Sequence, residues 1–370
     1  MSLHERYKLT KLINARGTFT PLGVSRSSSS VCQSVSKALS EFLIIDELQS
    51  VASEKISQLT GAEAGIVTHC TSAGITLSIA AAMVGNTPEK VAALPDTTGL
   101  PNRVILPAGH SINYGHPITQ DIRLAGATPI IVGKNDICTE SDLYEALSIS
   151  DTVCLLLVSS RLTRGNSIDF NKAVVAAHKN KIPVIIDGAA QDFRLVELLK
   201  TGADLVLTSA HKYLCAPTAG LVIGKKYLVD AVRAQEKGIG RAMKASKESI
   251  IGVISALEDR QQLNLVSWKK KQAKKVSYFI ETANKLKGLN ASSVIDPTGL
   301  PFTRVYMKID SNLIWMDAFT LAQKLKTGLP PIWVMDHQCE NNHIIFELVQ
   351  LKENELDIIL KRLSQIITKH

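Results

Sequence analysis

Asp187 and Lys212 are two side chains of opposite charge that each follow an apolar run in this 370-residue chain. The runs, 183–186 and 204–207, are typical of buried strands, and a helical stretch separates them. A strand–helix–strand unit has a right-handed crossover, which brings both side chains to the carboxyl edge of one parallel sheet. Open α/β sheets bind ligands at that edge. The pair therefore predicts an acid and an amine in one ligand site.

An acid and an amine at such an edge suit pyridoxal phosphate (PLP). Lys212 would form a Schiff base with the cofactor, and Asp187 would keep the pyridine nitrogen protonated so that the ring accepts electrons from a carbanion. On spacing alone, a strand-end aspartate and a solvent-exposed lysine are the simpler interpretation. The flanking residues decide between the two.

The segment SAHK (209–212), followed by Pro217 and Gly220, resembles the lysine segment of fold-type I PLP enzymes of the class V kind, such as cysteine desulfurases. In those enzymes the serine and histidine before the lysine help to hold the cofactor phosphate. The resemblance implies that role for Ser209 and His211, and a Schiff-base role for Lys212.

Three further segments are similar to the same fold type and occur in the expected order. His110 follows the strand predicted at 103–106, where such enzymes place a ring that stacks on the pyridine. Asp187 and Ala189 match the D-x-A after a later strand. The phosphate cup, in which helix N-terminal amides and hydroxyls meet the phosphate, is matched by four residues that open an Ala-rich helix: Thr71, Ser72, Ala73 and Gly74.

A closer resemblance extends over nearly the whole chain and rests on five motifs: INARGTFTPLG (13–23), LTGAEAGIVTHCTSAG (59–74), AGATPIIVG (125–133), GADLVLTSAHK (202–212) and GIGRAMKASKESIIG (238–252). These resemble the selenocysteine synthase-like family that includes D-glucosaminate-6-phosphate ammonia lyase. The family implies a PLP-dependent transferase-like fold, a homodimer or larger assembly with active sites near the interface, and α,β-elimination of ammonia from an amino-sugar acid or other amino acid. Lys212 would then also move a proton at the substrate Cα.

Two departures from the family leave alternatives open. Selenocysteine synthases carry an additional N-terminal tRNA-binding domain, whereas only residues 1–12 precede INARGT here. The lysine follows Ala-His rather than the Gly-Gly of lyase-like members, so His211 could serve phosphate binding or acid–base chemistry. The alternatives are a selenocysteine synthase-like transferase, a class V-type aminotransferase or racemase, and a tRNA-binding or regulatory protein on a PLP scaffold, because fold alone does not fix chemistry.

Basic side chains near the predicted sheet edge suit a small anionic amino compound as substrate. Arg161 and Arg164 follow the strand predicted at 153–158, and a guanidinium binds carboxylate or phosphate through two parallel hydrogen bonds. A solvated loop arginine is the plainer interpretation of either. The other predicted substrate-binding residues lie in two of the family motifs: Arg241, Lys244, Asn14 and Arg16.

Short aliphatic runs separated by helical stretches must position these residues. Such runs are typical of a mostly parallel sheet covered by helices on both faces, which is an α/β fold. The predicted strands are 103–106, 129–132, 153–158, 183–186, 204–207 and 221–223. The predicted domains are a 1–45 segment packing on the small domain and active-site mouth, a large PLP-binding α/β domain at 46–245, connecting helices at 246–290 and a small α+β domain at 291–370.

Composition narrows the class of protein. Hydrophobic residues make up 45% of the chain, which supports a folded core and argues against disorder. No apolar run approaches the roughly 18–20 residues of a membrane span, and the N-terminus lacks the apolar stretch of a signal peptide. Six cysteines without CxxC spacing fit reduced thiols. We expect a cytoplasmic protein without membrane association.

A net charge of +8 is the one compositional hint of a nucleic-acid partner. Its sharpest cluster, 269–275, is more simply a solvated helix face. Aromatic residues make up only 5% of the chain, which leaves few platforms for stacking bases. The excess charge is therefore assigned to small anions. The polar stretch 336–343 is interpreted as a loop, and no metal site is predicted.

Overall fold

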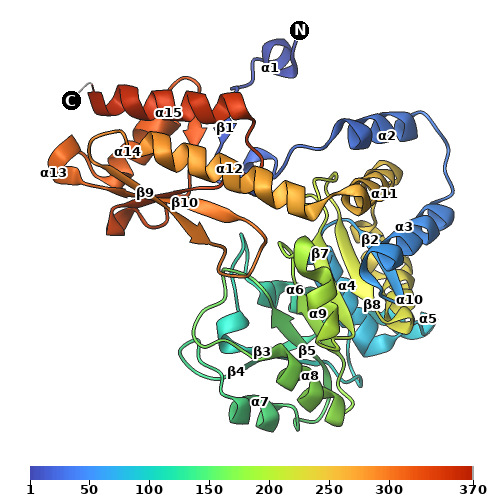
Figure 1. Cartoon of the computed structure of the whole chain (residues 1–370). Helices are drawn as coiled ribbons and strands as arrows, with labels where there is room; N and C mark the ends of the chain where they lie inside the picture. Colours follow the sequence, from blue (N-terminus) through green and yellow to red (C-terminus); the bar gives the residue numbers. More distant parts are fainter. Residues whose placement is uncertain (369–370) are drawn as a thin grey trace. The chain divides into compact units, whose positions relative to one another are not determined.

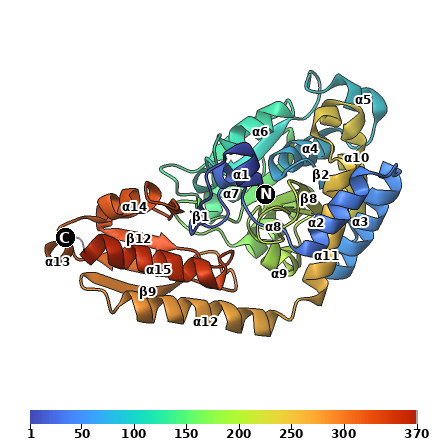
Figure 2. The same cartoon turned by 90° about the horizontal axis from the view of Figure 1, so that it is seen from above.

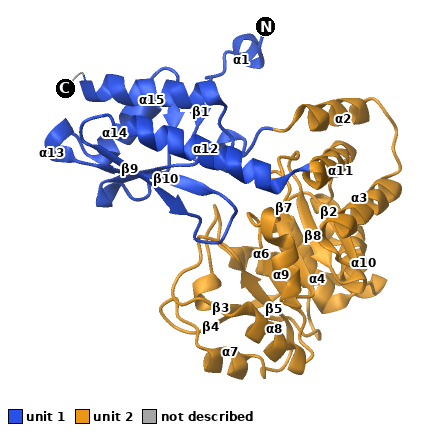
Figure 3. Ribbon diagram, in the orientation of Figure 1, with its two compact units in different colours: residues 1–26, 263–370 blue, residues 27–262 orange. Residues whose placement is uncertain are grey.

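The computed structural model describes residues 1–368, and the chain forms two compact units. Unit 2 is the continuous stretch 27–262, and unit 1 joins residues 1–26 to the chain from Leu263 onward (Figure 3). These limits differ from the domain limits predicted at 45/46, 245/246 and 290/291. The described residues include no helix long and apolar enough to cross a membrane.

A seven-stranded sheet with the order β2-β8-β7-β6-β5-β3-β4 forms the centre of unit 2 (Figure 1). Only β8 runs antiparallel to its neighbours, so the other six strands share one direction. The strands are β2 (Ala64–Thr68), β3 (Arg103–Pro107), β4 (Thr128–Val132), β5 (Thr152–Val158), β6 (Val184–Asp187), β7 (Leu205–Ser209) and β8 (Gly220–Gly224).

Helices cover both faces of this sheet. They are α2 (Ser29–Leu39), α3 (Ile45–Thr60), α4 (Thr71–Val84), α5 (Pro88–Ala93), α6 (Ile118–Leu124), α7 (Glu140–Ala146), α8 (Phe170–Lys179), α9 (Leu195–Lys200), α10 (Lys226–Ala234) and α11 (Lys247–Gln262). Short 3₁₀ turns are η2 (Ala108–His110), η3 (Asp192–Arg194), η4 (Gln235–Lys237) and η5 (Ile239–Met243).

The apolar runs are continuous because alternate residues of each strand enter two separate cores. Leu155 and Leu157 of β5 join one buried cluster, whereas Leu156 joins the other. Ile186 and Ile185 of β6 divide in the same way. Both faces of the sheet are therefore apolar, as expected of strands that helices cover on both sides.

The predicted α/β fold with a mostly parallel sheet is confirmed, and each of the six predicted strands is present within two residues of its expected bounds. Strand β2 was not predicted, because Ala64 and Gly65 weaken its strand signal. The antiparallel direction of β8 was not predicted either, since a buried apolar run carries no information about direction.

Unit 1 contains a three-stranded antiparallel sheet, β12-β10-β9, and a parallel pair of short strands, β1 and β11. In Figure 2, α12 and α15 run beside this sheet and contact each other. The strands are β1 (Ile13–Asn14), β9 (Leu289–Ile295), β10 (Thr303–Ile309), β11 (Ile332–Trp333) and β12 (His343–Phe346). The helical segments are α1 (Leu3–Tyr7), η1 (Thr20–Leu22), α12 (Leu265–Ala283), α13 (Ser311–Ile314), α14 (Ala318–Lys326), η6 (Cys339–Asn341) and α15 (Glu353–Thr368).

Candidate active site

The parallel strands of unit 2 bring the main predicted residues to one edge of the sheet. Asp187 is the last residue of β6, and Ser209 is the last residue of β7. Thr71 begins α4 shortly after β2 ends, and His110 closes the turn that follows β3. Because β2, β3, β6 and β7 run in the same direction, these residues all lie at the carboxyl ends of strands, as predicted.

Asp187 is a buried carboxylate, only 4% exposed, whose Oδ1 accepts a hydrogen bond from the Ala189 amide at 3.0 Å. Burial raises its pKa to about 6, against the opposing effects of the nearby Lys212 ammonium and the Ala189 amide. A carboxyl group with this pKa exchanges a proton readily near neutral pH. It is suited to share a proton with a bound heterocyclic base.

Lys212 lies within electrostatic range of Asp187. Burial lowers the pKa of its ammonium, the carboxylates of Asp187 and Asp192 oppose this shift, and the charge of Arg161 adds to it. A desolvated lysine loses its proton more readily and becomes a better nucleophile. The structure therefore places the predicted acid–amine pair together, with Asp187 buried and Lys212 half-buried.

The first turn of α4 offers donors to an anion. The Gly74 amide bonds to the Cys70 carbonyl at 2.9 Å, and the Ala73 amide is capped by Cys70 Sγ at 3.5 Å. This leaves the amides of Thr71 and Ser72 as the first-turn groups that no helical carbonyl accepts. The Thr71 hydroxyl lies 2.5 Å from the Ser209 hydroxyl, which joins the helix to the end of β7. The first four residues of α4, Thr71, Ser72, Ala73 and Gly74, are called the cup below.

Gly74 explains how α4 reaches the sheet so closely. A Cβ atom at this position would lie 3.1 Å from side-chain atoms of both Leu207 and Val222. Glycine therefore lets the first turn of α4 rest directly on β7 and β8. The same contact fixes the cup relative to Ser209, two residues beyond Leu207.

His110 presents an uncharged ring at the end of β3. Its Nδ1 accepts the Val158 amide at 3.1 Å, which leaves the ring proton on Nε2. Burial lowers the pKa of His110 to about 4, so the imidazole is neutral near pH 7. The ring is only 4% exposed and packs edge-on against Phe170 at 6.0 Å.

His211 turns toward the backbone, with Nδ1 lying 3.3 Å from the Ala219 carbonyl. Burial lowers its pKa, and the Ala219 carbonyl opposes that shift. The charges of Lys212 and His69 lower it further. His69 therefore lies near the site, although the sequence analysis did not select it.

Of the predicted substrate-binding residues, four belong to unit 2. Arg161 and Arg164 lie in the loop after β5, and Arg164 pairs with Asp136 at 3.7 Å through exposed side chains. Lys244 forms an isolated bridge with Thr68, and the His69 amide bonds to the Met243 carbonyl at 3.0 Å. The segment that contains Arg241 and Lys244 thus runs beside the strand end that leads into the cup.

Asn14 and Arg16 belong to unit 1 and are held by their own surroundings there. Asn14 Nδ2 donates to the Gly17 carbonyl at 2.8 Å. Arg16 pairs with Asp336 at 2.6 Å and lies over the Phe19 ring at 4.4 Å. Asp336 belongs to the predicted polar loop, and the described residues contain no group of three or more metal-ligating side chains.

Buried charged groups near the site escaped the sequence analysis. Asp192 is 2.7 Å from Arg260 of α11, which also lies over the Phe193 ring and donates to the Tyr213 carbonyl. Asp121 is fully buried and bonded to Ser72 of the cup. No motif marks these residues, and the only signal was their place among apolar neighbours, where a charge needs a partner.

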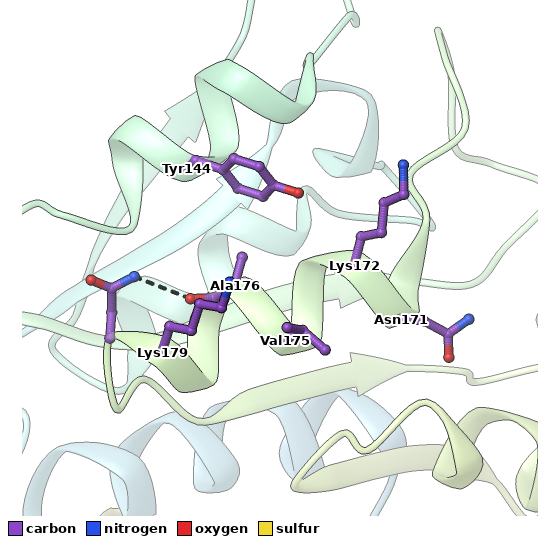
Figure 4. A pocket seen from close by; sticks show the side chains of 7 residues that line it. Tyr144, Asn171, Lys172, Val175, Ala176 and Lys179 are labelled. Carbon is purple, nitrogen blue, oxygen red and sulfur yellow. Dashed lines mark hydrogen bonds between the residues drawn. The ribbon is translucent and has the colours of Figure 1, made fainter.

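A separate hollow lies between α7 and α8 and shares no residue with this site (Figure 4). Its side chains include Tyr144, Lys172 and Val175, and Lys172 pairs with Glu140 at 2.7 Å. Lys179 is the other charged residue of the lining.

Three comparisons with known proteins bear on the site. The family model for "SelA: L-seryl-tRNA selenium transferase" matches residues 184–290. D-glucosaminate-6-phosphate ammonia lyase of Salmonella typhimurium is 31% identical over 99% of this chain and 98% of that protein. The 5'-C-glycyluridine monooxygenase-decarboxylase of Streptomyces sp is 28% identical over 99% of this chain and 92% of that protein. A solved structure of D-glucosaminate-6-phosphate ammonia-lyase superposes with a TM-score of 0.89. The sequence identity is 31%, and the superposition covers 100% of this chain and 99% of the solved one.

Proposed function

Since this chain belongs to the D-glucosaminate-6-phosphate ammonia lyase family, we propose that it is a PLP-dependent lyase that eliminates ammonia from an anionic amino-sugar acid. The observation that carries the proposal is the pair of a buried Asp187 and a half-buried Lys212 at the carboxyl edge, beside the free first-turn amides of α4. These groups match the three chemical parts of PLP: a basic ring nitrogen, an aldehyde and a phosphate.

The side chains of unit 2 fit that cofactor. The amides of Thr71 and Ser72, with the Thr71 and Ser209 hydroxyls, would hold the phosphate. Asp187 would hold a proton at the ring nitrogen, and its pKa of about 6 favours such sharing. The neutral His110 ring would cover one ring face without adding charge. When bound, PLP supplies an aldehyde for amines and a ring that withdraws electrons from the substrate Cα.

The chain's own residues then account for the proton transfers. The Lys212 amine, with a pKa lowered by burial, would remove the proton from the substrate Cα. Arg161, which lies within electrostatic range of Lys212, would pair with the substrate carboxylate. Arg164, Arg241 and Lys244 would bind a substrate phosphate, and the family resemblance assigns substrate binding to Asn14 and Arg16 of the N-terminal motif as well.

We also infer that the protein works in the cytoplasm as a homodimer or larger assembly. All six cysteines are free thiols, which suits a reducing compartment. The assembly is inferred from the family resemblance. Light scattering of the purified protein should give a mass of at least twice 40.2 kDa.

The test of the function is an assay with D-glucosaminate 6-phosphate and its unphosphorylated form. We expect release of ammonia and a keto acid from the phosphorylated compound, and loss of turnover in Lys212→Ala. The matched control is Lys225→Ala, which removes an exposed lysine paired with Glu63. No product from either compound, or equal activity in both variants, would contradict the lyase proposal.

A selenium transferase is the less favoured alternative. The family model with that name covers 184–290, a segment that holds the Asp187–Lys212 pair common to both reactions, so the match does not separate them. The full-length similarity to the ammonia lyase favours elimination. Salt-sensitive binding of a tRNA at physiological ionic strength would favour the transferase instead.

A further inference from the structure

Asp121 of α6 is a buried carboxylate that is hydrogen-bonded to Ser72 of the cup. Its Oδ1 accepts the Ser72 hydroxyl at 2.6 Å, and its Oδ2 accepts the Tyr114 hydroxyl. Its own carbonyl accepts the Thr76 hydroxyl at 3.1 Å, which ties α6 to α4 a second time. The side chain is fully buried, so these bonds replace those that water would make.

Tyr114 is in turn held by His116. The His116 Nε2 lies 3.0 Å from the Tyr114 hydroxyl and 3.4 Å from Asp121 Oδ1. The two rings meet edge to face at 4.8 Å, and His116 Nδ1 lies 3.0 Å from Gln120 Oε1. Because Tyr114 donates its one proton to Asp121, its oxygen is left to accept from His116. The four side chains Ser72, Asp121, Tyr114 and His116 form a chain of hydrogen bonds, called the Asp121 network below.

This arrangement has two consequences for an anion in the cup. Ser72 has a single hydroxyl proton, which it gives to Asp121, so that proton is not offered to the anion. Asp121 also puts a negative charge one hydroxyl away from the free amides of the first turn. That charge reaches further into the site, since it raises the pKa of Asp187.

The donors of the network counteract that charge. Tyr114 donates to one oxygen and His116 lies close to the other, so both disperse the charge on Asp121. Burial raises the pKa of Asp121, and the bonds from Ser72 and Tyr114 and the charge of His116 oppose this effect. Two residues of the loop before α6, Tyr114 and His116, thereby modulate the charge of Asp121.

We propose that Asp121 is a positioning residue that sets how tightly the cup holds a phosphate dianion: its carboxylate opposes phosphate binding, and Tyr114 counteracts it. The proposal rests on the proposed function, because the phosphate concerned is that of PLP.

Replacement of Asp121 by asparagine is a clean test because every hydrogen bond has a partner in the variant. Ser72 donates to the new amide oxygen, the amide NH₂ donates to Tyr114, Tyr114 donates to His116 Nε2, and His116 Nδ1 donates to Gln120. Each hydrogen bond of the network can be remade, the negative charge is lost, and one additional amide N–H is introduced. A loss of stability in Asp121→Asn would be detected separately from PLP affinity, as a lower melting temperature.

The experiment compares the affinity of PLP with that of pyridoxal, which has no phosphate, for four variants stripped of cofactor. We expect the ratio of the PLP affinity to the pyridoxal affinity to rise about 10-fold in Asp121→Asn, because a changed pKa of Asp187 affects both ligands alike. At alkaline pH, where Asp121 stays ionised without the tyrosine, Tyr114→Phe should bind PLP several-fold more weakly, and should lose this effect in the Asp121→Asn background. The matched control is Asp204→Asn, a buried carboxylate that accepts the Val184 amide at the opposite end of β6. It should leave both affinities unchanged.

Weaker binding of PLP by Asp121→Asn, or parallel losses for PLP and pyridoxal, would show that the network only supports the fold and would overturn the proposal. Unchanged affinities in all variants, with normal PLP binding by the wild type, would overturn it too while sparing the proposed function. If the wild type bound no PLP, both would fail. Should Asp121→Asn not fold, Tyr114→Phe alone decides, since its side chain is on an exposed loop.

Discussion

At the scale of single residues, the site depends on charges that are kept out of water. Asp187, Asp192 and Lys212 are each shifted from their ordinary pKa values mainly by burial. Such shifts cost folding free energy and are typical of sites that use them for chemistry. Asp187 and Lys212 were predictable because one ends a strand and the other follows a strand closely, each within a motif. Asp192 was not predicted, because its partner, Arg260, is 68 positions away and no periodic pattern joins them.

Asp187 provides a residue-scale test of this cost. Its pKa is raised from 3.8 to about 6, so ionisation is harder in the folded protein than in the unfolded chain. The folded state is therefore favoured most below pH 4, and that advantage is lost as the pH rises through 6. In cofactor-free protein, Asp187→Asn should raise the free energy of unfolding at pH 8 by about 1–3 kcal/mol.

The measurement is urea unfolding at pH 4 and pH 8, with the two proteins compared at each pH. The gain should vanish at pH 4, where both side chains are uncharged. The same variant should bind PLP more weakly, because the proton at the ring nitrogen loses its partner. An equal stability difference at both pH values would disprove the origin of the shift.

At the scale of elements, the site depends on close contacts between α4 and the sheet. Gly220 begins β8, and a Cβ there would lie 2.4 Å from the Cys70 carbonyl carbon at the cap of α4. Gly220→Ala should displace the cup, lower the free energy of unfolding by about 1–3 kcal/mol and weaken PLP binding. A suitable control is Gly61→Ala, at the left-handed end of α3, where a Cβ meets no atom and the cost is backbone strain alone. Similar PLP affinity in both variants would contradict the role of Gly220.

The Arg260–Asp192 pair links α11 to the turn after β6 and makes a second element-scale prediction. Arg260→Met would leave Asp192 buried without its cation, which should cost about 3–5 kcal/mol. Adding Asp192→Asn should recover most of the loss, as a thermal melt would show. Arg233→Met, which breaks the exposed pair with Asp46, should cost under ~1 kcal/mol. Equal costs for the two arginine variants would argue against a buried pair.

Elements with a strong pattern were predictable from sequence, and those without one were not. The predicted strand 303–309 and helix 353–368 coincide with β10 and α15. In β10 the buried residues Val305, Met307 and Ile309 recur at strand spacing, and in α15 the buried residues Leu356, Ile359, Leu360 and Leu363 recur at helix spacing. The polar residues of β9, such as Asn290 and Ser292, hide that strand, which has an exposed side. The contact of α6 with α4 through Asp121 depends on tertiary packing that no local signal reports.

At the scale of the whole molecule, the basic residues behind the net charge of +8 differ in role: some stabilise the fold and others are exposed to solvent. Within the 269–275 cluster, Lys275 is half-buried and donates to the carbonyls of Leu348, Val349 and Leu351, so it has a structural role in unit 1. Lys269, Lys270 and Lys271 are exposed, as the solvated-face interpretation expects. The excess charge therefore does not form one continuous binding stripe along this helix.

This division of charge predicts the behaviour of the whole protein with nucleic acid. The triple variant Lys269→Gln, Lys270→Gln, Lys271→Gln should keep wild-type lyase activity, because these side chains only meet solvent. Filter binding should detect no specific tRNA complex for either protein at physiological salt. Loss of a tRNA complex in the triple variant would instead support the RNA-binding alternative.

The central claim is that Lys212 holds PLP beside Asp187, and peptide mapping after borohydride reduction tests it most directly. Purified protein incubated with PLP should absorb visible light, lose that absorbance on reduction, and carry the added cofactor mass on the peptide that contains Lys212. Lys212→Ala should take up no mass, and Lys225→Ala should behave as the wild type. A colourless protein, or cofactor mass on another lysine with Lys212 unmodified, would contradict the account.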